Sequence, residues 1–109
     1  MVPKADGTLR LCTDFRKVNN CTVPDPFPLP RIEDLIDRVG KTTYLTKLDT
    51  TRGYWQVPVD DPSVLISAFV TPFGHFQWRY MPFRLRNAPA TFSRLVSKLL
   101  LGLDVFCVA

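Results

Sequence analysis

Hydrophobic residues recur at helical spacing in two stretches of the chain, which predict helices over 32–39 and 88–101. Gly40 and Gly102 follow the last turns of these helices, and Asn87 precedes the second one as an N-cap. The apolar residues that share one helical face are Ile32, Leu35, Ile36 and Val39 in the first helix, and Phe92, Leu95, Val96 and Leu99, expected as a buried stripe, in the second.

Other stretches carry the signals of strands and of extended chain. Loose alternation over 8–15 after a turn at Asp6-Gly7 predicts the second strand of a hairpin, and residues 66–71 and 75–81 predict a hairpin around Pro72-Phe73-Gly74. Further strands are expected over 43–48, 56–59 and 104–109. Prolines at every second position of 24–30 exclude helix and ladder and predict a stiff, extended connector.

The composition is that of one packed domain or a piece of one. The 109 residues are 46% hydrophobic and 22% charged. The N-terminal sequence has no secretion signal, and no apolar run approaches the ~20 residues of a membrane span. These features predict an intracellular protein, cytoplasmic or nuclear, without a membrane partner. Three cysteines with no CxxC pair suggest neither a disulfide framework nor a zinc site.

The net charge of +4 is unevenly distributed along the chain. Residues 1–61 carry nine basic and nine acidic side chains, whereas residues 62–103 carry five basic side chains and no acid. A one-sided basic segment suits phosphate groups, and a merely solvated face is the alternative. The five cations are Arg79, Arg84, Arg86, Arg94 and Lys98.

Asp49 is the leading candidate for chemistry. A carboxylate at the end of a strand, followed by a tight turn with free N–H groups, can hold a divalent cation that also binds phosphate oxygens. A turn or helix-capping role for this aspartate is the alternative.

Five motifs in register extend this pattern. They are DFRKxN (14–19), PxPxPLPR (24–31), LDxxxGYxQ (48–56), AFVTPxG (68–74) and MPFxLxNAPATF (81–92). In order and spacing they resemble the reverse transcriptase of gypsy-type long-terminal-repeat retrotransposons, and the resemblance covers essentially the whole chain.

The resemblance implies an α+β fold, namely a truncated polymerase palm of antiparallel sheet backed by helices, with part of the fingers. Residues 1–30 would belong to the fingers, and residues 31–109 to the first part of the palm with a fingers hairpin. The strand over 104–109 would lie beside the strand that ends at Asp49.

In that family, three aspartates hold two Mg²⁺ ions for primer extension. Asp49 matches the first aspartate. The other two belong to a Tyr-x-Asp-Asp turn, which is expected to begin where this sequence ends. The chain is therefore expected to bind one magnesium ion weakly at most and to be inactive by itself.

The resemblance also assigns nucleotide-binding residues. Lys4 and Arg10 match the basic residues that hold the incoming triphosphate, and Arg52 and Gly53 match the turn whose N–H groups meet it. Tyr54 matches the steric gate against a ribonucleotide 2′-hydroxyl, and a buried palm tyrosine is its alternative role. Phe83 and Arg84 match the residues beside the nucleotide.

Arg84 departs from the family pattern, which has glycine at this position. If the backbone there needs a positive φ, an arginine adds strain of about 1–2 kcal/mol. The turn into the following helix matches the part of the family that lies under the template, and the residues expected to contact nucleic acid are Arg86, Asn87, Pro89 and Arg94.

The resemblance therefore implies a fragment of an RNA-directed DNA polymerase. Its partners would be an RNA or DNA template-primer, deoxynucleoside triphosphates and the rest of a retroelement polyprotein. A non-enzymatic nucleic-acid-binding remnant of such an element is the alternative with the same fold. An RNA-recognition sheet module is a third, although its Lys/Arg-Gly-Phe signature is missing.

Overall fold

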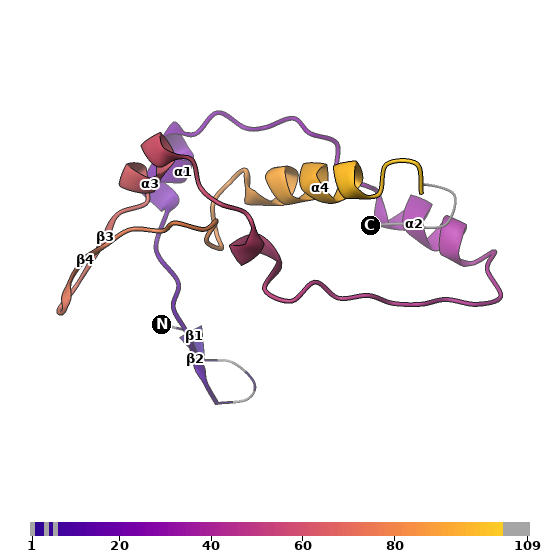
Figure 1. The fold of residues 1–109 in the computed structure, drawn as a ribbon, viewed down its shortest axis with the longest axis horizontal. Coiled ribbons are helices and arrows are strands. Elements are labelled where there is room, and N and C mark those ends of the chain that lie inside the picture. The colour runs from indigo at the N-terminus through magenta and orange to yellow at the C-terminus, as the bar shows by residue number, and fades with distance from the viewer. Residues whose placement is uncertain (1, 4, 6, 104–109) are drawn as a thin grey trace.

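The computed structural model describes residues 2–3, 5 and 7–103 (Figure 1). These residues form an α+β protein, as predicted from the sequence. In chain order the elements are β1 (Val2–Pro3), β2 (Leu9–Arg10), α1 (Arg16–Cys21), α2 (Ile32–Val39), the 3₁₀ helix η1 (Gly53–Gln56), α3 (Asp61–Ile66), β3 (Phe69–Thr71), β4 (Gly74–Phe76) and α4 (Ala88–Leu99). The predicted strand over 104–109 lies outside the described residues.

Two separate antiparallel hairpins make up the described sheet structure. In the first, Val2 pairs with Arg10 and Pro3 with Leu9. In the second, Phe69 pairs with Phe76 and Thr71 with Gly74, so Pro72 and Phe73 form the turn. Both hairpins were predicted, but their strands are shorter than expected. Gly74 belongs to β4 with a φ of 138°, a backbone conformation that glycine adopts without strain.

The predicted strand over 56–59 is reduced to a single bridge between Pro58 and Tyr80. Two hydrogen bonds flank the bridge, from Val59 N–H to the carbonyl of Arg79 at 3.0 Å and from Met81 N–H to the carbonyl of Val57 at 2.9 Å. A proline at the centre has no N–H to donate, so the pairing stays short. Gln56 belongs to η1 instead.

The predicted strand over 43–48 is absent from the structure. Residues 44–50 form neither helix nor strand, and the side chains of Tyr44 and Leu48 are almost fully exposed, at 92% and 90%. In Figure 1 this stretch runs as an open segment from α2 back to η1. A strand requires a hydrogen-bonded neighbour, and none of the described residues provides one here.

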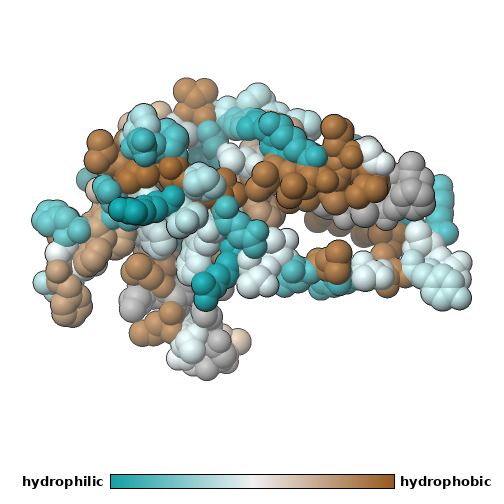
Figure 2. Space-filling view, viewed as in Figure 1, coloured by the Kyte–Doolittle hydropathy of each residue, from teal (hydrophilic) through white to brown (hydrophobic). Residues whose placement is uncertain are grey.

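Helices α2 and α4 agree closely with the predictions. Gly40 is the C-cap of α2, and α4 ends at Leu99, two residues before the expected end. The predicted buried stripe of α4 is wrong, because Phe92 and Val96 are only half-buried and Leu95 and Leu99 are exposed. The buried residues of this helix are Ala88 and Ala90. Figure 2 shows the resulting hydrophobic surface over α4. Leu95 and Leu99 are the exposed large hydrophobic residues of this helix.

Helices α1 and α3 were not predicted. The residues directly after the predicted strand over 56–59 start α3, with Asp60 as its N-cap and Pro62 in its first turn. Proline fits there because the first N–H groups of a helix have no intrahelical partner. Before α1, whose N-cap is Phe15, Asp14 accepts a hydrogen bond from the Arg16 backbone N–H at 3.0 Å.

The described chain is extended rather than compact. Its radius of gyration is 17.0 Å, against about 13 Å expected for a compact chain of this length. The buried hydrophobic residues of the described part are Phe15, Met81, Ala88 and Ala90. They bring together α1, the 81–87 connection and the start of α4. The described helices are too short to cross a membrane.

Candidate functional site

The turn before η1 places Tyr54 against α4. Arg52 has a left-handed φ of 56°, and its carbonyl accepts a hydrogen bond from Trp55 N–H at 2.7 Å. A Cβ added at Gly53 would lie 3.2 Å from Cζ of Phe92, closer than most side-chain contacts. Glycine at this position therefore lets η1 approach the Phe92 ring.

Aromatic rings connect this turn to the 81–87 connection. The ring centroid of Tyr54 lies 5.4 Å from that of Phe83 and 5.4 Å from that of Phe92, the second pair in edge-on geometry. Trp55 lies 5.8 Å from Phe83 and 6.4 Å from Trp78. These separations are typical of favourable aromatic pairs. Tyr54 and Phe83, two of the residues assigned by resemblance to the nucleotide site, are thus in contact.

The cluster continues into the second hairpin. Trp78 stacks on Phe69 at 5.8 Å, and Phe69 lies 5.9 Å from Phe76. The indole N–H of Trp78 donates to Thr13 Oγ at 3.1 Å, and the Trp78 backbone N–H donates to the buried hydroxyl of Ser67 at 2.9 Å. The β3–β4 hairpin therefore packs against η1, which contains Tyr54 and Trp55, through the stacked rings of Trp78 and Trp55.

Arg84 adopts a positive φ of 73°. This is the backbone conformation in which an arginine is strained where the family has glycine. Its side chain is exposed. A left-handed residue with a Cβ carries a strain of about 1–2 kcal/mol, which glycine avoids. Together with Asp14, Arg16 and Asn19, Arg84 lines a surface hollow of about 300 Å³.

In that hollow, Asp14 and Arg16 form an exposed ion pair with an Oδ2 to Nη2 distance of 2.6 Å. Hydrogen bonds from the Arg16 side chain lower the pKa of the Asp14 carboxyl from 3.8 to about 2. Asp14 therefore stays ionised at neutral pH, and the hollow carries two cations against one anion.

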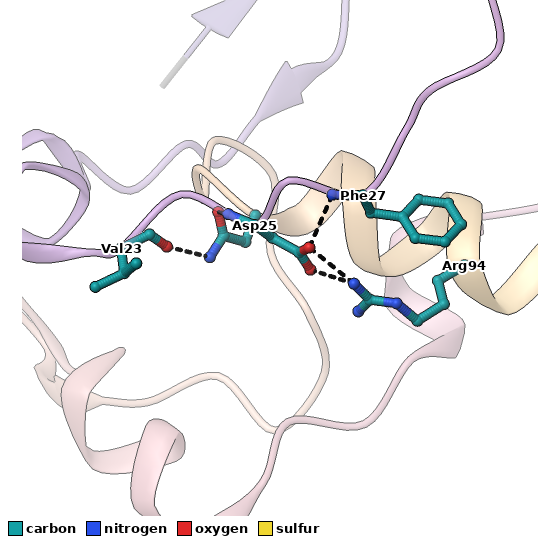
Figure 3. A network of polar contacts seen from close by, with 5 residues as sticks. Val23, Asp25, Phe27 and Arg94 are labelled. Atoms are coloured by element: carbon teal, nitrogen blue, oxygen red, sulfur yellow. Dashed lines mark hydrogen bonds and ion pairs between the residues drawn. The ribbon is translucent and has the colours of Figure 1, made fainter.

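A second polar network joins the proline-rich segment to α4 (Figure 3). Arg94 Nη2 donates to both carboxylate oxygens of Asp25, at 2.7 and 2.8 Å, and its guanidinium lies 4.8 Å from the centre of the Phe27 ring. The Phe27 backbone N–H also donates to Asp25 Oδ1 at 3.0 Å. The hydrogen bond from Arg94 holds the pKa of the Asp25 carboxyl below its usual value.

Asn87 extends this network to the backbone of the same segment. Its Oδ1 accepts a hydrogen bond from Asp25 N–H at 3.0 Å, and its Nδ2 donates to the Val23 carbonyl at 2.9 Å. Asn87 is the N-cap of α4, as predicted, but its side chain makes no capping hydrogen bond to this helix.

The residues expected to contact nucleic acid therefore differ in their surroundings. Asn87 and Arg94 are half-buried and bonded to the proline-rich segment. Arg86 and Pro89 are exposed, and Arg86 Nη1 donates to the Asn19 carbonyl at 3.3 Å.

Asp49 stands apart from these clusters. It is exposed and has no hydrogen-bond or ion-pair partner among the described residues. The described part of the chain also contains no group of three or more His, Cys, Asp or Glu side chains that could hold a metal ion. These residues do not form the donor set of a two-ion magnesium site.

Two predicted nucleotide-binding residues come from the N-terminal part of the chain. Lys4 lies outside the described residues, and Arg10 is placed by its backbone in β2. Conversely, Asn19, Asp25 and Phe92 were not predicted to shape the site. Asn19 and Phe92 lie within the quoted motifs, and Asp25 is the only acid among the prolines, but nothing in the local pattern identifies their partners.

The chain matches the reverse transcriptase (RNA-dependent DNA polymerase) family over residues 2–108 and belongs to that family. Its members generally use divalent metal ions.

Curated relatives agree with this assignment. The chain is 43% identical over 105 residues to an RNA-directed DNA polymerase homolog of Oenothera berteroana, covering 93% of this chain and 72% of that protein. It is 40% identical over 100 residues to the retrovirus-related Pol polyprotein from transposon 297 of Drosophila melanogaster, covering 90% of this chain and 9% of the polyprotein. An enzymatic polyprotein of figwort mosaic virus is 34% identical over 102 residues, covering 94% of this chain and 15% of the polyprotein. In the transposon 297 and figwort mosaic virus relatives, the matched region is thus a small part of a polyprotein.

Proposed function

We propose that this chain is part of a gypsy-type reverse transcriptase that adds deoxynucleotides to a primer on an RNA or DNA template. The contact between Tyr54 and Phe83 carries the proposal. These residues come from separate motifs, and the resemblance places both beside the incoming nucleotide. Their ring centroids lie 5.4 Å apart in the folded chain. The match to retroelement polyproteins supports the same function.

In this proposal, Tyr54 is the steric gate. Its ring is half-buried and is held between Phe83 and Phe92. A ring fixed on two sides excludes an extra hydroxyl group better than a freely rotating one, because moving it would disrupt both contacts. Arg52 and Gly53 would meet the triphosphate in the turn that precedes Tyr54, where the Gly53 N–H also donates to the Thr50 carbonyl at 3.3 Å. Lys4 and Arg10 would supply the positive charges that hold the triphosphate.

Arg84 and Phe83 would lie beside the nucleotide, and Arg86 and Pro89 would face the nucleic acid. We assign Asn87 and Arg94 a less direct part, since both hold the proline-rich segment on α4. The fingers would comprise residues 1–30, and the palm with a fingers hairpin residues 31–109. The template-primer, deoxynucleoside triphosphates and the remainder of a retroelement polyprotein are the proposed partners.

For the metal site, we propose that Asp49 supplies one carboxylate. The other two would come from a Tyr-x-Asp-Asp turn that the family pattern places after Ala109. Because the described residues hold no such cluster, we expect the 109-residue chain alone to extend no primer.

Primer extension by a chimera tests this function. The chain is joined to a gypsy-type continuation that contains Tyr-x-Asp-Asp and the thumb, either unchanged or with Arg84→Gly. We expect robust magnesium-dependent synthesis only with Arg84→Gly, and its loss with Asp49→Asn but not with Asp37→Asn, an exposed acid of α2. Primer extension by the 109 residues alone, or full activity with Asp49→Asn, would contradict the proposal.

A second candidate function is nucleic-acid binding without catalysis. One observation favours it: of the five cations in residues 62–103, only Arg94 forms an ion pair within the described part of the chain. The other four carry charges that no described carboxylate pairs with, although Arg86 uses Nη1 on the Asn19 carbonyl. The two functions differ in the chimera, because a binding remnant would bind the template-primer and extend nothing.

A further inference from the structure

We infer that Asn19 is a positioning residue, which holds the turn of residues 84–86 in the shape that presents Phe83 and Arg84. Asn19 lies in α1, and its side-chain amide makes two hydrogen bonds to this turn. Nδ2 donates to the Arg84 carbonyl at 2.9 Å, and Oδ1 accepts from the Arg86 N–H at 2.9 Å. These two bonds, which bracket Leu85, form the Asn19 clamp.

The chemistry of the clamp is specific to an amide. A carboxamide has a donor and an acceptor side by side, and the turn offers a carbonyl and an N–H in matching positions. Rotating the amide by half a turn would place Oδ1 against the Arg84 carbonyl, two acceptors, and Nδ2 against the Arg86 N–H, two donors. A carboxylate could keep the bond to Arg86 N–H but would oppose the Arg84 carbonyl with a second acceptor.

A second asparagine makes the same pair of hydrogen bonds in the opposite direction, from the start of α4 to the chain that follows α1. Asn87 donates to the Val23 carbonyl and accepts from the Asp25 N–H, so its two bonds also lie on either side of a single residue, Pro24. Asn19 therefore holds the segment that carries Asn87, and Asn87 holds the segment that follows α1. The Asn19 clamp is one half of a reciprocal connection.

The 84–86 turn needs such support because Arg84 is left-handed, with a φ of 73°. A non-glycine residue leaves this conformation readily unless its surroundings hold it there. The turn belongs to no helix or strand. The Asn19 clamp holds both ends of the turn, and Arg86 Nη1 adds a longer bond of 3.3 Å to the Asn19 backbone carbonyl, which Asn19→Ala would leave in place.

Fixing this turn also fixes Phe83, which precedes Arg84 and contacts both Tyr54 and Trp55. Loss of the clamp should let Phe83 move away from these rings. The consequence for nucleotide placement rests on the proposed function. The effect on ring packing does not rest on the proposed function, so an experiment can contradict either statement without the other.

The test uses the fluorescence of Trp55 in the 109-residue chain. Trp78→Phe leaves Trp55 as the single tryptophan, and all variants are compared in this background. Trp55 is 38% exposed and partly covered by Phe83. With Asn19→Ala, we expect Trp55 emission to shift to longer wavelength and acrylamide quenching to increase. Asn20→Ala is the matched control, because Asn20 is the next residue of α1, is exposed, and makes no side-chain hydrogen bond in the described chain.

The role of backbone strain gives a second arm. In an Arg84→Gly background the left-handed turn carries no strain, so Asn19→Ala should shift Trp55 emission less than it does with Arg84 present. Far-UV circular dichroism verifies that each variant is folded. If Asn19→Ala loses its helical signal, Asn19→Asp takes its place, and the smaller shift of a half-broken clamp is expected.

Unchanged Trp55 emission and quenching in the folded Asn19 variant would overturn the proposal. So would a shift of equal size with Arg84 and with Arg84→Gly. Neither measurement involves nucleotide, template or metal, so a failed primer-extension experiment would leave this result standing.

Discussion

Arg94 and Asp25 are 69 residues apart in the sequence, yet both carboxylate oxygens of Asp25 accept hydrogen bonds from Arg94 Nη2, at 2.8 and 2.7 Å. The pair joins α4 to a segment whose alternate residues are prolines. Such a segment lacks the N–H groups with which a strand would pair with its neighbour. Side-chain contacts therefore hold the proline-rich segment against α4, and Phe27 lies against the Arg94 guanidinium.

This pair predicts a specific acid sensitivity. Hydrogen bonding to Arg94 lowers the pKa of Asp25 in the folded chain relative to its ordinary 3.8. Its contribution to stability is therefore complete above pH 3.8 and is lost as the pH falls through the lowered folded value. We expect Asp25→Asn to lower the thermal midpoint at neutral pH and to flatten its decline in acid.

Thermal unfolding followed by circular dichroism over a pH series measures this effect. Asp37→Asn is the control, because Asp37 is exposed on α2 and forms no ion pair in the described chain. Asp14, whose pKa is about 2, accounts for part of the remaining acid dependence. An identical pH profile for the unaltered chain and Asp25→Asn would contradict the prediction.

Arg84→Gly is predicted to stabilise the folded chain. Removing the Cβ relieves about 1–2 kcal/mol of left-handed strain, while the more flexible unfolded glycine chain costs about 0.4–1 kcal/mol. The net gain in the free energy of unfolding therefore lies between about 0 and 1.6 kcal/mol, which urea denaturation measures. Arg86→Gly is the control. Arg86 has no positive φ, so this change should destabilise the chain.

Tyr54→Ala is predicted to admit ribonucleotides in the chimera that restores polymerase activity. Truncation removes the ring held between Phe83 and Phe92 and opens the space that a 2′-hydroxyl requires. Incorporation of ribonucleotides relative to deoxynucleotides should rise at least tenfold, which corresponds to about 1.4 kcal/mol of discrimination.

Tyr54→Phe retains the ring and should preserve the discrimination. Tyr44→Ala serves as the second control, because Tyr44 is 92% exposed and makes no ring contact in the described part of the protein. Unchanged discrimination against ribonucleotides in an active Tyr54→Ala enzyme would show that Tyr54 is not the steric gate.

Nucleic-acid binding by the 109-residue chain is predicted to weaken steeply with salt. Each duplex phosphate neutralised contributes about 0.9 to the slope of log affinity against log salt concentration. Replacing either Arg84 or Arg86 with alanine removes one cation that can neutralise a phosphate, so each substitution should reduce that slope by about 1. Fluorescence anisotropy with a labelled duplex at several salt concentrations measures the slope.

Lys41→Ala is the matched control for this experiment, since Lys41 is an exposed cation in the half of the chain where acids balance bases. Duplexes of unrelated sequence should bind equally. Affinity that does not change with salt, or that depends on one base sequence, would exclude phosphate contact as the basis of binding.

Local pattern predicted the elements whose stability is largely local. Helices α2 and α4 follow from apolar periodicity, and the hairpin around Pro72 and Phe73 follows from its turn residues. The positive φ of Arg84 was also foreseeable, because a family glycine marks a backbone position that side chains avoid. Helix α3 was missed although its signal was present, since Asp60 and Pro62 suit a helix start as well as a strand end.

Elements that depend on a distant neighbour were not predictable in the same way. β-branched and aromatic residues over 43–48 favour a strand, but a strand forms only beside a partner. The buried stripe expected of α4 failed at Leu99 for a related reason, because periodicity identifies an apolar face and says nothing about whether another element covers it.

The sequence by itself determined the family, through motifs whose order and spacing need no coordinates, and it determined the candidate residues within them. Tertiary structure alone decided that Asn19 bonds the Arg84 turn, that Arg94 pairs with Asp25, and that Tyr54 contacts Phe83. The physical reason is range. Periodicity and turn chemistry act over a few residues, whereas these hydrogen bonds and ring contacts join segments far apart in the chain and form only when folding brings them together.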